Sequence, residues 1–105
     1  MSKRAMDMGQ RQREEARWRI LRILDAGRPI GVGEEIILRV LDDLRLGLGP
    51  AGVRRELDYL SDLKLAEVGQ EDDGSWYAKL TADGVDLVEY TAPAPPGVAR
   101  PKRYW

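Results

Sequence analysis

Apolar residues recur every three or four positions through much of the chain, which is the spacing of helices with one buried face. The first such helix is predicted from about Gln10 to Ala26, because Gly27 is a natural stop. Its apolar stripe consists of Ala16, Ile20, Leu21, Ile23 and Leu24. Trp18 falls outside this stripe. Arg17 falls on it, where a snorkelled aliphatic stem would account for its position.

Two more helices are predicted in the middle of the chain. Gly33 can cap the first of them, and Glu34 and Glu35 follow where the helix dipole favours acids. Its apolar positions are Ile36, Ile37, Val40, Leu41 and Leu44. After the turn "RLGLGP", the next helix begins at Pro50, a residue preferred in a first turn, and ends near Lys64 or Leu65. Its apolar face holds Val53, Leu57 and Leu60.

The pattern then changes to strict alternation, which predicts a hairpin of "LAEVGQ" and "SWYAKL" joined by "EDDG". Asp73-Gly74 is a strong tight-turn signal. Trp76, Ala78 and Leu80 alternate onto one face, and Val68 joins them in covering the open side of the helices. An extended piece at Ile30–Val32 would pair with the hairpin edge as a third strand.

Thr81 is a good N-cap for a last helix that reaches about Tyr90, with Val85 and Val88 inward. The order helix, short strand, helix, turn, helix, hairpin, helix predicts a mostly helical α+β fold, the winged helix-turn-helix. It would have a three-helix core, a small antiparallel β-wing, a C-terminal helix and an extended Pro-rich tail. The domain would span residues 10–90, between a basic N-terminal arm over 1–9 and a Pro-rich, basic and aromatic tail over 91–105.

The amino-acid composition limits the catalytic and metal-binding chemistry that we expect of this protein. Cysteine and histidine are absent from the 105 residues, which removes thiol, disulfide, zinc and His-based mechanisms. The scattered carboxylates form no paired acid/base site, and "GRPIGVG" lacks the spacing of a dinucleotide loop. We therefore expect no enzyme, no catalytic or metal site and no cofactor. With no signal core and no apolar run long enough to span a bilayer, a cytoplasmic protein without a membrane partner is expected.

Charge is unevenly distributed although the total is −1. Residues 1–28 hold eight basic and four acidic side chains, a net of +4. Residues 29–90 hold six basic and fourteen acidic side chains, a net of −8, and the last fifteen residues add +3. An acidic body with a basic segment at each end is therefore predicted.

Two sets of motifs resemble known proteins. "VRRELDYLSDLKLAEV" followed by "WYAKLTADGVDLVEY" resembles winged-helix regulators of the ArsR and MarR type. "ILRIL", "VRRELDYL", "LTADGVDLVEY" and "PGVARPKRYW" together resemble the small winged-helix proteins of Mu-like phages and prophages. This resemblance implies a phage or prophage transcriptional regulator. The chain departs from short-tailed members of that group by ending in Lys102, Arg103, Tyr104 and Trp105.

In one interpretation, the third helix presents Arg54, Arg55 and, one turn later, Tyr59 to double-stranded DNA. In the other, these arginines pair with Glu56 and Asp58 on a solvated helix. Asp58 and Asp62 would face phosphate unfavourably.

The wing offers Lys79 as a DNA contact, but its tip of Glu71, Asp72 and Asp73 would repel phosphate. The tip is either a solvated turn or a surface that docks on a basic protein.

The termini provide further candidate contacts. Arg11 and Arg13 in the basic N-terminal stretch could follow a DNA backbone, while the leading helix could instead build a homodimer interface or stay solvated. The candidate docking residues of the tail are Arg100, Lys102, Arg103, Tyr104 and Trp105. These aromatic and basic side chains would fold back on the body, dock on a sister subunit or insert into a partner.

Two functions remain open from the sequence. One is a DNA-binding regulator, with double-stranded DNA as the partner and a homodimer as the expected form. The other is an adaptor on the same scaffold that binds a phage or host protein in phage lytic development or assembly.

Overall fold

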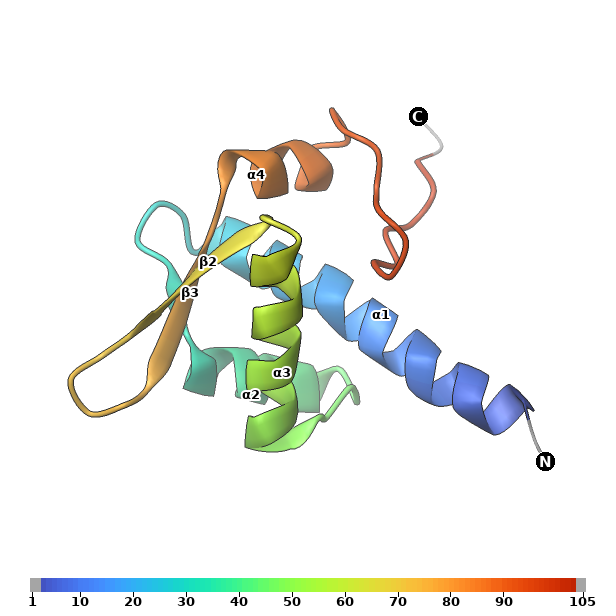
Figure 1. Ribbon diagram of the computed structural model, residues 1–105, viewed down its shortest axis with the longest axis horizontal. Coiled ribbons are helices and arrows are strands. Elements are labelled where there is room, and N and C mark those ends of the chain that lie inside the picture. The colour runs from blue at the N-terminus through green and yellow to red at the C-terminus, as the bar shows by residue number, and fades with distance from the viewer. Residues whose placement is uncertain (1–2, 104–105) are drawn as a thin grey trace.

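A computed structural model describes residues 3–103, with side chains from Met8 onward (Figure 1). The elements are α1 (Lys3–Ala26), β1 (Val32–Gly33), α2 (Glu34–Asp43), α3 (Gly49–Asp62), β2 (Ala66–Gln70), β3 (Trp76–Leu80) and α4 (Ala82–Val88). This order of four helices and three strands within the described range is the one predicted from the sequence. None of the described helices combines the length and the apolar character needed to cross a bilayer.

The first helix differs from its prediction at both its start and its buried face. It begins at Lys3 rather than near Gln10, because the polar residues of its first half are good helix formers that need no apolar stripe. Figure 1 shows this half projecting beyond the other helices. Trp18 is 2% exposed, since the ring of Tyr90 packs edge-on against it at 6.3 Å between ring centroids.

The core lies where α1, α2 and α3 meet under the sheet. Its fully buried side chains include Ile20, Leu21, Leu24, Ile37, Leu41, Val53, Leu57 and Leu60. The apolar face predicted for α2 includes two residues that are not buried, because Ile36 is 55% and Leu44 41% exposed. Leu44 is already the C-cap of the helix, and Ile36 faces the solvent beside the wing.

The sheet has the order β1-β3-β2, with antiparallel pairing throughout. Val32 pairs with Ala78, so the predicted third strand is confirmed, although it begins at Val32 and Ile30 stands outside it, 82% exposed. Ala78 is buried, and Trp76 and Leu80 pack against the core on the same face, as the alternation predicts.

The last helix follows its predicted cap. Thr81 Oγ1 accepts a hydrogen bond from the Gly84 amide at 3.0 Å and donates one to the Lys64 carbonyl at 2.7 Å. The helix ends at Val88, before Tyr90, and its buried residues are Gly84 and Leu87, whereas Val85 and Val88 are only half-buried. The glycine is required because a Cβ at that position would collide with the Leu65 carbonyl.

The tail, predicted to be extended, packs along α1 and α4 as far as it is described. Val98 is 7% exposed, and the Ala99 amide donates to the Glu14 carbonyl at 3.1 Å. Arg100 Nη1 donates to the carbonyls of Leu87 and Ala92 at 2.9 and 2.7 Å, which covers the C-terminal end of α4. The segment from Val98 to Arg100 therefore packs against the helices.

Helices α2, α3 and α4 end in the same way, without glycine. Arg45, Lys64 and Tyr90 each adopt a left-handed conformation two residues after the helix, with φ of 60°, 65° and 64°. After α2, the Leu46 amide bonds to the Leu41 carbonyl at 2.8 Å, the pattern of a Schellman motif. These positions favour glycine, so the chain accepts a backbone cost at each of them.

We expect Arg45→Gly to raise the free energy of unfolding by about 0.5–1 kcal/mol, because glycine relieves the left-handed strain at an exposed position. The measurement is urea unfolding followed by circular dichroism. Arg39→Gly, on the exposed face of α2, is the matched control and should lower stability by about 1 kcal/mol. A destabilised Arg45→Gly protein would contradict this account of the turn.

Candidate nucleic-acid interface

Arg54 and Arg55 follow each other in α3 but lie on opposite flanks of the helix. Arg54 lines a depression between α3 and the start of α2, together with Glu34 and Pro50. Arg55 lines a different depression of about 320 Å³ between α3 and α1, together with Arg13. The two arginines therefore have separate environments.

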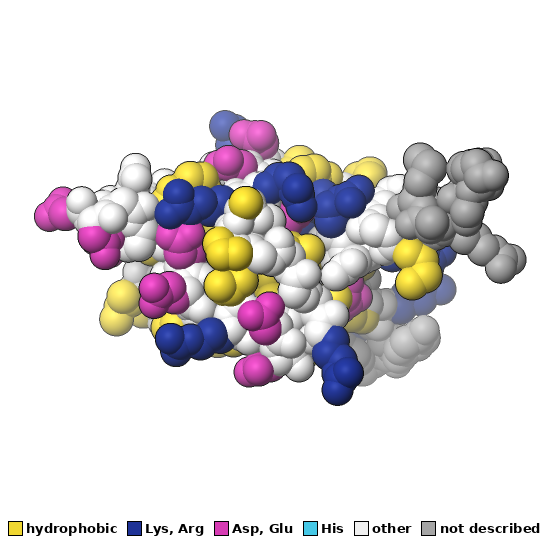
Figure 2. Space-filling model, turned by 90° about the horizontal axis from the view of Figure 1, so that it is seen from below, with side chains coloured by type: hydrophobic (Ala, Val, Ile, Leu, Met, Phe, Trp, Pro, Cys, Tyr) yellow, Lys and Arg dark blue, Asp and Glu magenta, His cyan; other side chains and the backbone are white. Residues whose placement is uncertain are grey.

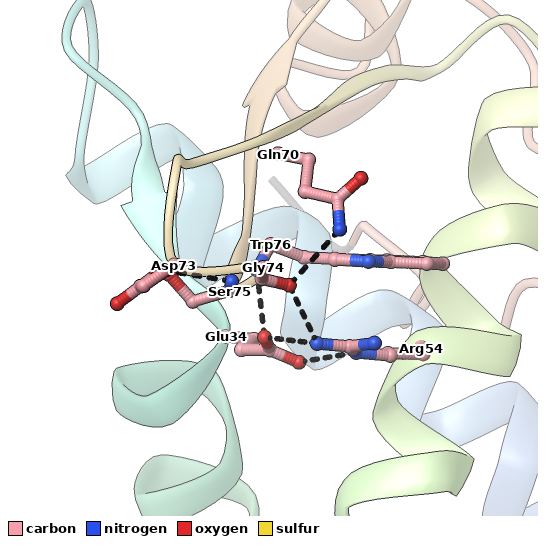
Figure 3. Close-up of polar contacts among 7 residues, drawn as sticks. All are labelled: Glu34, Arg54, Gln70, Asp73, Gly74, Ser75 and Trp76. Carbon is pink, nitrogen blue, oxygen red and sulfur yellow. Dashed lines mark hydrogen bonds and ion pairs between the residues drawn. The ribbon is translucent and has the colours of Figure 1, made fainter.

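Arg54 belongs to a polar network that joins α2, α3 and the wing (Figure 3). Its Nε and Nη2 donate to the two Glu34 carboxylate oxygens at 2.7 and 2.8 Å, and Nη2 also donates to the Gly74 carbonyl at 3.1 Å. The guanidinium carbon lies 4.7 Å from the centroid of the Trp76 ring, over which the group stacks. Arg54 is therefore held within its own protein, by the Glu34 carboxylate and the Gly74 carbonyl on one side and by the Trp76 ring on the other.

Glu34 is the acceptor at the centre of the network. Besides Arg54, its carboxylate accepts a 2.6 Å hydrogen bond from the Trp76 amide, the first residue of β3. The hydrogen bonds from Arg54 lower the pKa of Glu34, and that from the Trp76 amide lowers it further, against the opposing effect of burial. Glu34 thus fixes the wing relative to α3 as long as it is ionised.

The wing tip is also ordered and anionic. Asp73 accepts hydrogen bonds from the amide and the hydroxyl of Ser75 at 2.9 and 2.6 Å, and these bonds lower its pKa. Gly74 supplies the positive φ of 88° that the turn needs. Because Glu71 and Asp72 are exposed beside Asp73, this tip would repel a DNA phosphate.

A second network fixes α3 against α1. Arg17 Nε donates to Glu56 at 2.7 Å, and its Nη1 donates to the Gly97 carbonyl at 2.9 Å. The guanidinium also stacks on Tyr59, 3.6 Å from the ring centroid. Since Arg17 is 12% and Glu56 only 1% exposed, this is a buried ion pair rather than a snorkelled stem. Glu56 therefore does not lie on the solvated face where the sequence interpretation placed it.

Arg55 and Arg13 lie together in the α1–α3 depression, whereas the Arg54 side chain, 40% exposed, lies outside it. The Arg55 side chain is 65% exposed and makes only a long 3.4 Å bond to Glu56, while Arg13 is half-buried in the same depression. Asp58 and Asp62 line it too. Figure 2 shows Lys and Arg side chains crossing the lower face of the molecule in a broken row, with acidic groups between them and at the wing end.

The other predicted DNA contacts lie elsewhere. Tyr59 lines the same depression as Arg13 and Arg55, but its ring is covered by Arg17. Lys79 is exposed near Lys64, at the C-terminal end of α3, and Arg11 lies beside Ala99 of the tail. The structure thus brings together three of the six predicted residues, Arg13, Arg55 and Tyr59.

The predicted docking residues of the tail are only partly described. Arg100 is bound to α4, and its guanidinium lies 4.3 Å from the centroid of Tyr90. Lys102 and Arg103 are exposed, with the Arg103 guanidinium 5.6 Å from the same ring. Tyr104 and Trp105 lie outside the described residues.

Sequence reasoning missed the roles of Glu34, Glu56 and Trp76. A signal for one pair was present, because Arg17 falls on the predicted apolar stripe of its helix and Glu56, of opposite charge, lies one turn from both Val53 and Leu60. Two such residues are expected to meet in the core, since an isolated buried charge is costly. No cluster of three His, Cys, Asp or Glu residues able to hold a metal occurs within the part of the chain that the structure describes.

Two solved structures share this architecture. One is a protein of Ralstonia eutropha JMP134 described as a candidate DNA-binding protein, 29% identical with a TM-score of 0.57 over 74% of this chain and 95% of its own. The other is a mutant of S. aureus MepR bound to an oligodeoxyribonucleotide, 19% identical with a TM-score of 0.59 over 82% of this chain and 67% of its own. No protein-family model and no curated protein sequence matches the chain significantly.

These likenesses identify the fold as a winged helix-turn-helix. Helices α2 and α3 form the helix-turn-helix pair, and the β2–β3 hairpin is the wing.

The lowered pKa of Glu34 predicts a specific loss of stability in acid. Its contribution is complete above the ordinary value of 4.5 and is lost as the pH falls through the lower pKa of the folded state. Glu34→Gln should therefore unfold at a lower urea concentration than wild type at pH 7, and the gap should narrow below pH 4.5. The measurement is urea unfolding across this pH range. Glu35→Gln, at the exposed neighbouring position, should keep the wild-type profile, and a gap that does not change with pH would count against the network.

The Arg17–Glu56 pair yields a second prediction. Arg17→Met leaves the buried Glu56 carboxylate with only the long 3.4 Å contact to Arg55, so the free energy of unfolding should fall by about 3–5 kcal/mol. Adding Glu56→Leu removes the buried charge and should restore most of this loss. Chemical denaturation measures both, and a double variant no more stable than Arg17→Met would show that the pair does not set this stability.

Proposed function

We propose that this chain is a winged-helix DNA-binding protein that presents α3 to the major groove of double-stranded DNA. The observation that carries the proposal is the accessible Arg55 on α3, with Arg13 of α1 beside it in one depression. Two cations so placed suit phosphate or base-edge contacts from one side of the helix. The similar structures support it, since one is described as a candidate DNA-binding protein and the other is bound to an oligodeoxyribonucleotide.

The two adjacent arginines would have different tasks. Arg55 would contact DNA directly, and Arg13 would add a backbone contact. Arg54, bound to Glu34 and stacked on Trp76, would act mainly by fixing the wing beside α3. Lys79 and Arg11 would add contacts at the flanks, away from Tyr59 and the central depression.

The finer parts of the proposal rest on the sequence resemblance. We propose that the protein regulates transcription from phage or prophage DNA of the Mu-like kind, in the cytoplasm and as a homodimer. The dimer surface that we propose is the first part of α1, because Figure 1 shows it extending beyond the other helices.

The test is DNA binding by fluorescence anisotropy, with DNA from upstream of its own gene, at about 50 and about 200 mM salt. Binding should weaken steeply with salt. Arg55→Ala and Arg13→Ala should each weaken it and reduce the slope of log affinity against log salt by about 1. Arg28→Ala, in the exposed turn after α1, is the matched control and should leave the slope unchanged.

Comparing Arg54→Ala with Glu34→Gln separates a positioning role from direct contact. If Arg54 acts by holding the wing, both variants lose affinity, although Glu34→Gln makes the protein less acidic. If Arg54 contacts DNA directly, Glu34→Gln releases it and affinity rises or stays the same. Undetectable binding of the wild type at low salt would refute DNA binding altogether.

A further inference from the structure

The side of the wing away from the α1–α3 depression carries a groove of about 400 Å³. Its walls are the loop before β1, the first turn of α2 and the hairpin from Glu71 to Tyr77. None of its described lining residues also lines the depression that holds Arg13 and Arg55. The groove is therefore separate from the central depression of the proposed DNA surface.

Two isoleucines make this groove unusual for a solvated surface. Ile30 is 82% and Ile36 is 55% exposed, and both line it. Among the described residues Ile30 is the most exposed large hydrophobic side chain. Single exposed apolar residues are ordinary, but two that meet in one groove favour an interaction surface.

The polar lining is acidic. Glu35, Glu71 and Asp73 line the groove together with Glu34, and none of its described lining residues is Lys or Arg. Arg54 neutralises Glu34 from the α3 side, which leaves the other three carboxylates without an ion pair among the described residues. Such a surface repels phosphate and attracts cations.

We propose that this groove binds an extended basic segment of a partner protein, one that alternates Arg or Lys with apolar residues. The apolar side chains would cover Ile30 and Ile36, and the cations would meet Glu35, Glu71 and Asp73. Charge complementarity selects this occupant, because an acidic or neutral peptide would gain nothing from the rim. The groove and the α3 surface could be occupied together, since they lie on different flanks.

The probe is an acetylated nonapeptide of alternating arginine and leucine, titrated into the full-length protein and followed by amide NMR shifts. The shifts should concentrate in residues 30–36 and 71–77. Ile30→Ser with Ile36→Ser should weaken binding about tenfold or more, and these exposed positions should tolerate the change. Leu44→Ser with Leu63→Ser, which removes exposed apolar residues elsewhere, should bind like wild type.

The contribution of the acidic side chains is tested with the same peptide titration. Glu35→Gln with Glu71→Gln should weaken binding, whereas Glu67→Gln with Glu89→Gln, an equal charge change at exposed positions outside the groove, should not. The proposal would be overturned if both double substitutions weakened peptide binding equally, or if the amide NMR shifts spread over the whole acidic body. The same set of shifts appearing when the protein alone is concentrated would also overturn it, because the occupant would then be a second copy.

Discussion

The arrangement of α3 and the wing depends on one carboxylate. Glu34, in the first turn of α2, accepts hydrogen bonds from Arg54 of α3 and from the Trp76 amide of β3. Three elements far apart in the sequence therefore meet at a single side chain that is 14% exposed. Charge-assisted hydrogen bonds of this kind are short and directional, so they help to fix the angle of the hairpin relative to α3.

This constraint gives two neighbouring arginines different properties. Arg54 satisfies Glu34, the Gly74 carbonyl and the Trp76 ring, and Arg55, one residue later, extends 65% exposed toward Arg13. The acidic wing tip agrees with this difference between the two arginines. The hairpin would hold α3 in place, and phosphate contacts would be made from the flank of α3 that carries Arg55. The surface proposed for nucleic acid thus carries Arg55 and Arg13 beside Asp58 and Asp62, and the surface proposed for protein is acidic and partly apolar.

Much of the fold could be predicted from the sequence. The apolar periodicity places α2 and α3, the alternation places the hairpin, and Thr81 marks α4, because these signals are local. The start of α1 could not be predicted, since a solvated polar helix has no apolar period. The pairing of Glu34 with Arg54 could not be predicted either, because residues 20 positions apart meet only once the helices have packed. The same is true of Arg17 and Glu56, whose charges signal a buried pair but do not identify it.

The most direct test is the NMR signal of the arginine Nε–H groups, recorded with and without DNA. Arg54 should show a downfield, slowly exchanging signal from its bond to Glu34, and this signal should persist in the complex. In the protein without DNA, the Arg55 signal should be averaged by exchange with solvent. It should shift when DNA binds. An Arg54 signal that loses its protection when DNA is added, while Arg55 stays unchanged, would contradict the division of roles on which this account rests.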